Sequence, residues 1–280
     1  MVLKYIFAHL FPLSLPLSLS FFSVHLHALG YYPSLGTVSL GTGGCALLYT
    51  DAFTAANNYA LMPLLKKPAM GFSATSIPGY GNSIQRGYCF VLPLKHIAYG
   101  VHQRSYGNDI LRDQTIGAGV AHALNPKLSF GIGAGYHHYS IVNYGRIHAF
   151  SLNVSFVSKL STRLTTAASL FNPFAAGLGS RQAEKLDRTM RIGAKYDFNK
   201  LVWAVTELEK STSSPLNFKS GIHYQFSSRI YCSAGYSSLA RFITLGLGFR
   251  NQRLSTGMAI AVPASGPVFT SVSMNYEIGK

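Results

Sequence analysis

Charged side chains are scarce in this sequence, and acidic ones are the scarcest. Only 12% of the 280 residues are charged, with 9 Asp and Glu against 24 Lys and Arg. A soluble domain usually carries about 25% charged residues, so an ordinary soluble enzyme is disfavoured. The 48% hydrophobic content excludes a disordered chain. The three cysteines are too few for a disulfide scaffold.

Long apolar runs are also missing after residue 28. Residues 1–28 have a positive charge at Lys4, an apolar run from Tyr5 to Val24 and a small residue, Ala28, at a plausible cleavage position. This pattern predicts a secretory signal peptide. The alternative, a retained membrane helix, is disfavoured by Pro12 and Pro16. No stretch of 18 apolar residues occurs after residue 28, so the sequence predicts no membrane-spanning helix there.

From residue 68 onward, apolar and polar residues alternate with a period of two. The alternation is clearest over residues 128–138, 148–156, 216–226 and 268–278. Residues 68–280 contain about fourteen such segments, or roughly 15 residues for each strand and its turn. This spacing suits membrane β-strands, which need about 9–11 residues.

Turns and aromatic residues give a second, independent signal. Short connections are expected at residues 92–95, 125–127, 159–161, 198–200, 227–229 and 251–253, and longer ones at 76–83, 105–113, 140–146 and 171–188. Aromatic residues expected at strand ends are Tyr139, Tyr196, Phe198, Tyr224, Phe226, Tyr236, Phe249 and Tyr276. Alternating loop lengths and aromatic girdles are typical of outer-membrane barrels. The pattern therefore predicts an all-β fold, a transmembrane antiparallel β-barrel of about 14 strands over residues 68–280, in the bacterial outer membrane.

The alternative is a secreted soluble β protein, whose strands would alternate in the same way. Its solvent-facing positions would normally carry many charged residues. The polar faces here are instead rich in Gly and Ser, which favours the membrane barrel.

Residues 29–67 do not alternate, and part of this segment has helical spacing. It is too short for a separate domain and precedes the first strand. We therefore expect a short plug, or hatch, inside the barrel, with Asp51 and Asn58 hydrogen-bonded to groups of the wall. Arg191, Lys195 and Lys219 are candidate basic partners for Asp51.

The plug segment contains a Gly-rich stretch, an Ala-Asp pair and an Asn-x-Ala-x-Leu-like motif. The residues are Gly41, Gly43, Gly44, Asp51, Asn58 and Ala60, with Tyr59 at a position where the motif has Pro. This pattern resembles the hatch of the long-chain fatty-acid transporter (FadL-like) barrels, and within them the PorV/PorQ-type outer-membrane proteins. The resemblance implies passive transport of small hydrophobic or amphipathic compounds. The alternative that it implies is an accessory or structural barrel of a type IX protein secretion system.

Seven basic residues are expected to face the lumen: His102, Arg104, Arg191, Lys195, Lys219, His223 and Arg250. One interpretation is a network of ion pairs with the few acidic residues, which would brace a narrow barrel. The other is a positive lumen that favours anionic amphiphiles such as fatty acids. The sequence leaves both open.

Motifs for catalysis or metal binding are absent or incomplete. Residues 41–46 fit G-x-G-x-x-A, but Lys66 and Lys67 stand where a dinucleotide-binding fold needs an acidic residue. His137 and His138 are neighbours on a strand, so they point to opposite faces and cannot share a metal. We expect no enzymatic activity, no cofactor, no metal and no nucleic-acid partner. The expected partners are outer-membrane lipid, a hydrophobic small molecule and, under the alternative, secretion-system proteins.

Overall fold

The computed structural model describes residues 33–77, 83–143, 145–178, 184–239 and 241–279. The predicted signal peptide, residues 1–28, and the first residues of the predicted plug lie outside the described residues. Among the described residues, no helix is long and apolar enough to cross a membrane.

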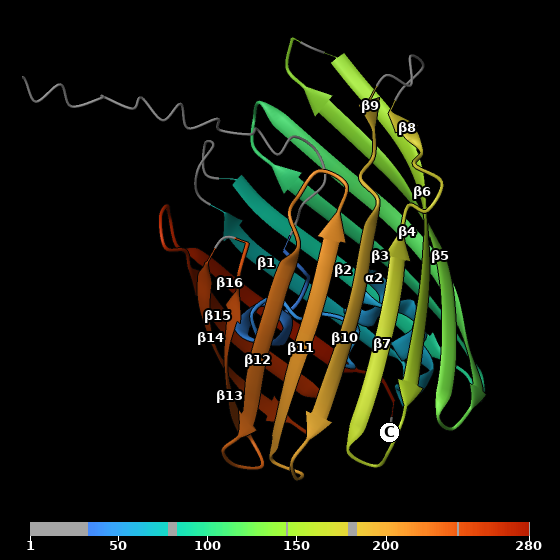
Figure 1. The fold of residues 1–280 in the computed structure, drawn as a ribbon, viewed down its shortest axis with the longest axis vertical. Helices are drawn as coiled ribbons and strands as arrows, with labels where there is room; N and C mark the ends of the chain where they lie inside the picture. Colours follow the sequence, from blue (N-terminus) through green and yellow to red (C-terminus); the bar gives the residue numbers. More distant parts are fainter. Residues whose placement is uncertain (1–32, 78–82, 144, 179–183, 240, 280) are drawn as a thin grey trace, which may run out of the picture.

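Fourteen antiparallel strands form a closed barrel, as the alternation predicts (Figure 1). Each strand pairs with its neighbours along the chain, and β1 closes the barrel against β16. The wall strands are β1 (Ala69–Ile77), β2 (Ser83–Pro93), β3 (Ile97–Gly107), β4 (Leu111–Asn125), β5 (Leu128–Ile141), β6 (Gly145–Lys159), β7 (Leu164–Phe171), β10 (Thr189–Asp197), β11 (Val202–Ser211), β12 (Asn217–Gln225), β13 (Ile230–Ser237), β14 (Phe242–Asn251), β15 (Leu254–Val262) and β16 (Phe269–Glu277). Closure pairs the backbone groups of every wall strand, which is the condition for a sheet to lie in lipid.

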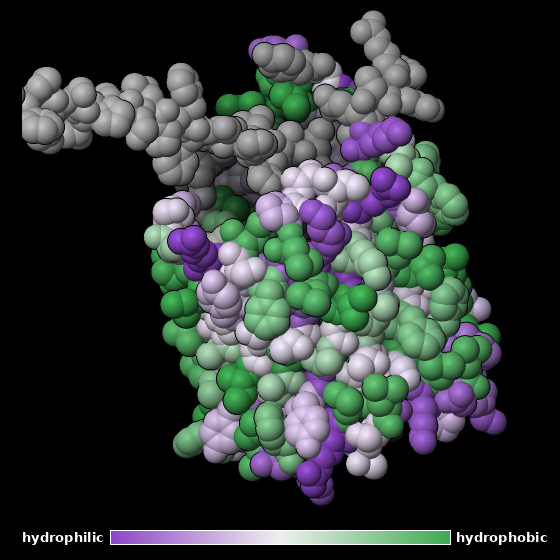
Figure 2. All heavy atoms as spheres, viewed as in Figure 1, coloured by the Kyte–Doolittle hydropathy of each residue, from purple (hydrophilic) through white to green (hydrophobic). Residues whose placement is uncertain are grey.

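The two faces of the wall differ as the period-two pattern predicts. Phe130, Ile222 and Val272 are 39%, 47% and 45% exposed on the outer face. Their neighbours Ser129, His223 and Ser271 are buried on the inner face. In Figure 2, hydrophobic side chains make up much of the middle of the visible outer surface, and hydrophilic ones gather mainly toward its two ends. The outer face therefore has the apolar band of a membrane barrel.

The segment of residues 33–67, called here the N-terminal segment, lies inside the barrel (Figure 1). It contains the helices α1 (Thr37–Gly41) and α2 (Thr54–Asn57) and the 3₁₀ helix η1 (Tyr59–Leu64). The helix α1 packs against β13–β16, and η1 packs against β2–β6. Leu35, Phe53 and Met62 of this segment are almost fully buried and form the apolar interior together with residues of the wall.

Two of the predicted long connections are wrong. Residues 105–113 and 140–146 were expected to be loops, but β3 to β6 extend into both ranges and leave only residues 108–110 and 142–144 as connections. The polar outward residues of these strand ends have a loop-like composition. Antiparallel pairing satisfies their backbone groups all the same, so the strands continue. The long connection between β7 and β10 is present, and it contains the small hairpin of β8 (Gly177–Leu178) and β9 (Glu184–Lys185).

Tyr139 and His137 are not girdle residues. Tyr139 was expected at the membrane interface, but both residues are only 2% exposed and lie on the inner face of β5. Other predicted girdle residues, such as Tyr196, Phe198 and Phe226, are exposed on the outer surface. The difference follows from parity, because odd-numbered residues of β5 point inward throughout its length.

Candidate functional site in the barrel lumen

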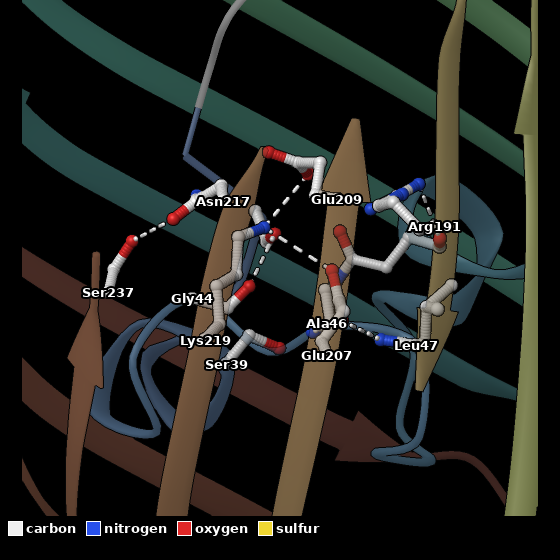
Figure 3. Close-up of polar contacts among 12 residues, drawn as sticks. Ser39, Gly44, Ala46, Leu47, Arg191, Glu207, Glu209, Asn217, Lys219 and Ser237 are labelled. Carbon is white, nitrogen blue, oxygen red and sulfur yellow. Dashed lines mark hydrogen bonds and ion pairs between the residues drawn. The ribbon is translucent and has the colours of Figure 1, made fainter. Parts of the chain in front are cut away.

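A buried carboxylate on the wall binds the backbone of the N-terminal segment. Glu207 in β11 accepts hydrogen bonds from the N–H groups of Ala46 and Leu47, at 2.9 and 3.1 Å (Figure 3). The Lys219 ammonium in β12 lies 3.3 Å from Glu207 and 2.8 Å from Glu209. Because Glu207 and Lys219 are almost fully buried, each charge depends on the other for compensation. We call Glu207, Glu209 and Lys219 the Glu207 cluster.

Polar side chains of other strands bind the segment in the same way. Ser273 accepts from Thr37 N–H, Asn275 from Ala52 N–H, and Ser155 from Ala60 N–H, at 2.8–3.1 Å. Ser129 in turn donates to the Ala60 carbonyl at 2.7 Å. The wall thus supplies partners for backbone groups that a short irregular segment cannot pair internally.

The predicted glycines lie where the segment approaches the wall most closely. At Gly41, an added Cβ would overlap Ser233 and lie 3.0 Å from the backbone of Gly246. Gly43 has a φ of 77°, and its N–H donates to Thr244 at 2.9 Å. Gly44 also has a positive φ, of 82°. These positions need glycine for contact and for backbone conformation.

In the part of the chain that the structure describes, the side chains of Asp51 and Asn58 bond within the segment and not to the wall, contrary to expectation. Asp51 accepts from Phe53 N–H, and Asn58 bridges the Leu47 carbonyl and Ala60 N–H, all within the segment. Among the described residues, no ion pair joins Asp51 to Arg191 or Lys195, and the ion pairs of Lys219 are with Glu207 and Glu209. Burial raises the pKa of Asp51 to about 7, while the Phe53 N–H and the nearby Arg250 charge act in the opposite direction.

The N-terminal segment separates two cavities. One, of about 160 Å³, lies toward the end of the barrel that carries the β7–β10 connection and is lined by Leu35, Tyr59 and Phe171 among others. We call it the upper cavity. The other, of about 330 Å³, lies toward the end with the short turns and is lined by Lys66, Lys67, Arg250 and Arg253 together with Asp51 and Glu277.

The upper cavity combines apolar surface with a few polar groups. Leu35, Leu40, Phe171, Phe242 and Phe269 supply apolar surface. His102 Nδ1, Asn153 Oδ1 and Arg191 Nε are buried atoms of its lining residues that have no hydrogen-bond partner in the described part of the chain. Buried polar atoms are normally paired with protein or water. These three atoms are therefore available to a ligand or to water.

The seven predicted basic residues all lie on the inner side of the wall, but they fall into two groups. His102, Arg104, Arg191 and Lys219 line the upper cavity. Lys195, His223 and Arg250 surround the aromatic rings of Tyr49, Trp203 and Tyr231 nearer the short-turn end, where Arg250 donates to the Tyr49 hydroxyl at 2.8 Å. Lys219 forms ion pairs with Glu207 and Glu209, and Lys195 forms one with Asp197. Both interpretations of the basic excess therefore keep some support.

His137 is a lumen residue that was not among the seven basic residues predicted to face the lumen. Its ring lies 3.0 Å from the Thr115 hydroxyl and 2.7 Å from the Ser151 hydroxyl, on the lining of the upper cavity. The parity of β5 was the signal that placed it inside. In the described residues no group of three metal-ligating side chains is present.

Comparisons with solved structures find barrels of the same architecture. The monoaromatic hydrocarbon channel CymD matches with a TM-score of 0.68 and 13% identity, over 88% of this chain and 98% of that one. The P. putida toluene transporter TodX matches with a TM-score of 0.68 and 12% identity, over 89% and 99%. A Pseudomonas aeruginosa FadL homologue matches with a TM-score of 0.64 and 13% identity, over 89% and 99%.

The chain has the FadL-like barrel fold. At these identities the likeness concerns the fold alone. No family model and no curated protein matches the sequence, and nothing in the comparisons supports the closer resemblance to PorV/PorQ-type proteins.

Proposed function

We propose that this protein is an outer-membrane channel for small, largely apolar molecules, and that the N-terminal segment is its plug. The observation that carries the proposal is the upper cavity: a chamber with apolar walls and a few polar atoms, inside a closed barrel and directly above the segment. The apolar outer face supports the membrane location, and the FadL-like fold agrees with it.

The size of the upper cavity suggests the size of the cargo. An apolar protein cavity of about 150 Å³ is large enough for benzene, and the upper cavity has about 160 Å³. We therefore expect single-ring hydrocarbons and short amphipathic molecules to fit without rearrangement. A polar end group would meet His102, Asn153 or Arg191, whose unpartnered atoms belong to the lining.

The attachment of the N-terminal segment supports its role as a plug. It lies between the two cavities and is held to the wall mainly by hydrogen bonds and apolar packing rather than by strand pairing. Such contacts can break locally without opening the barrel, since the wall strands pair only with one another. Passage then needs a shift of the segment, not of the wall.

Uptake by cells tests the proposal. Bacteria whose outer membrane limits hydrocarbon entry are given this barrel, and the initial uptake of radiolabelled toluene is measured. We expect faster uptake than with an empty vector. Replacement of Ala56, which lies in α2 and lines the upper cavity, by Phe should reduce the gain because the added ring fills the chamber.

The matched control is Ala264→Phe, which adds the same ring at an exposed position between β15 and β16. It should leave uptake unchanged. Equal uptake with and without the folded barrel would contradict the proposal. The accessory role in type IX secretion has no specific observation in its favour, because none of the matching structures named above is described as a secretion protein.

A further inference from the structure

Three neighbouring strands are longer than a membrane requires. The strands β4 and β6 have 15 residues and β5 has 14, whereas a membrane strand needs about 9–11. Outward residues from Ile116 to Leu124 in β4 and from Phe150 to Phe156 in β6 are mostly apolar. These stretches account for the membrane crossing. The remaining residues, at the end of the barrel that carries the β7–β10 connection, lie beyond it.

The first outward residues beyond this apolar stretch form a basic patch. Cross-strand pairing places Arg112, Ser140 and Arg146 in one row. The next row, closer to the membrane, contains Gln114, His138 and His148. Neighbouring strands lie about 4.8 Å apart, so the backbones of the two arginines are about 10 Å apart. We call these six residues the outer basic patch.

The two arginines of the patch have no partner in the part of the chain that the structure describes. Among the described residues, no ion pair or side-chain hydrogen bond involves Arg112 or Arg146, and both are exposed. Asp113, the neighbour of Arg112, is buried on the inner face. The imidazole rings of His138 and His148 lie against each other, with centroids 4.7 Å apart. The patch therefore offers several donors at one place, and among the described residues no acid is paired with its arginines.

Apolar and aromatic surface continues directly below the patch. Ile116, Tyr136 and Phe150 form the next cross-strand row and are 60%, 37% and 69% exposed. A cationic cluster on top of apolar surface matches a lipid whose phosphate lies above its acyl chains. Guanidinium groups bind phosphate oxygens through paired hydrogen bonds, and each arginine near a lipid surface adds to the affinity.

We infer that the outer basic patch binds a phosphorylated glycolipid of the outer leaflet, with its phosphates on Arg112 and Arg146 and its acyl chains over Tyr136 and Phe150. The inference rests on the proposed outer-membrane location but not on transport. Charge complementarity and membrane depth favour this occupant over a protein partner, which would not need the apolar row.

Lipid titration of the purified, folded barrel tests the inference. Bisphosphorylated lipid A, monophosphorylated lipid A and phosphatidylethanolamine are added in detergent, and bound lipid is counted by native mass spectrometry. We expect the bisphosphorylated form to bind best. The double variant Arg112→Gln, Arg146→Gln should weaken this binding about tenfold and abolish the preference for the second phosphate.

The matched control removes two exposed arginines from turns at the opposite end of the barrel, as Arg163→Gln, Arg229→Gln. It carries the same change of net charge and should bind lipid A as the original chain does. Heat-modifiable migration on gels confirms that each variant is folded. Equal binding by the two double variants, or equal binding of all three lipids, would overturn the inference.

Toluene uptake by cells that carry Arg112→Gln, Arg146→Gln keeps the two proposals apart. Uptake at the original rate together with lipid binding that does not depend on the patch overturns this inference alone. Patch-dependent binding in a barrel that gives no uptake supports this inference and contradicts the transport function.

Discussion

At the scale of single residues, the interior of this barrel depends on close fits and buried charges. Tyr59, the position at which the hatch-like motif has Pro, occupies a notch between Gly119 and Gly133 on paired strands. Glu207 is almost fully buried, yet it accepts hydrogen bonds from two backbone N–H groups and forms an ion pair with Lys219. A buried carboxylate is tolerated only with such compensation. The Glu207 cluster is therefore a specific attachment point between wall and segment.

Replacement of Glu207 by Ala should loosen the N-terminal segment without unfolding the barrel. The change leaves the Ala46 and Leu47 N–H groups without acceptors, at about 1–3 kcal/mol for each buried group. Hydrogen exchange of these two amides should accelerate strongly. The comparison is Glu277→Ala, which removes an exposed carboxylate at the end of β16 and should leave both amides protected. Unchanged exchange in Glu207→Ala would show that the cluster does not hold the segment.

At the scale of secondary-structure elements, small residues on the inner face of β4 and β5 match the shape of η1. A Cβ at Gly131 would lie 2.6 Å from the Ala60 nitrogen, and one at Gly133 would overlap the Tyr59 ring. The sequence pattern relates these glycines only to the polar face of a membrane barrel. The structure gives a different reason, because the N-terminal segment occupies that lumen and needs the space above the sheet.

Gly133→Val should displace η1 while the wall still closes. The added side chain competes with Tyr59 for the same volume, and overpacking of this kind costs about 1–3 kcal/mol. Limited proteolysis should then cut within residues 45–65 of the folded, heat-modifiable barrel. Ala118→Val, on the lipid face of the neighbouring strand, is the control: it also ends in valine and adds two methyl groups where nothing opposes them. If both variants resist proteolysis equally, η1 does not depend on the glycine notch.

At the scale of the whole molecule, the wall and its contents are topologically independent. The first wall strand starts at Ala69 and pairs with β2 and β16 only, so no residue of the N-terminal segment belongs to a wall strand. Closure of the barrel requires only the fourteen strands. The segment closes off the lumen between the two cavities under the proposed function, and its removal should affect permeability more than folding.

Deletion of residues 34–60 should give a heat-modifiable barrel that leaks small polar solutes. The deletion removes the residues that separate the upper cavity from the cavity at the short-turn end, but it removes none of the strand pairing. Swelling of proteoliposomes in isotonic solutions of small sugars measures the leak. The control replaces residues 174–177 of the β7–β10 connection, which lie outside the lumen, by Gly-Ser repeats. It alters a connection without removing the N-terminal segment. A folded deletion variant without a leak would contradict the plug.

The sequence by itself determined the wall, because strand formation and the choice of face are local properties. Alternation within about ten residues decides which side chain meets lipid, and the fourteen strands that it predicts are the number found in the barrel. The tertiary structure alone decided the lumen and the outer basic patch. Ala46 and Glu207 are 161 residues apart in sequence. Neither the partner of Asp51 nor the row of Arg112 and Arg146 follows from local pattern. The inward placement of His137 does follow from the parity of β5, but its contacts with Thr115 and Ser151 do not. Such contacts depend on strand register and barrel closure, which relate distant parts of the chain and leave no periodic signal in the sequence.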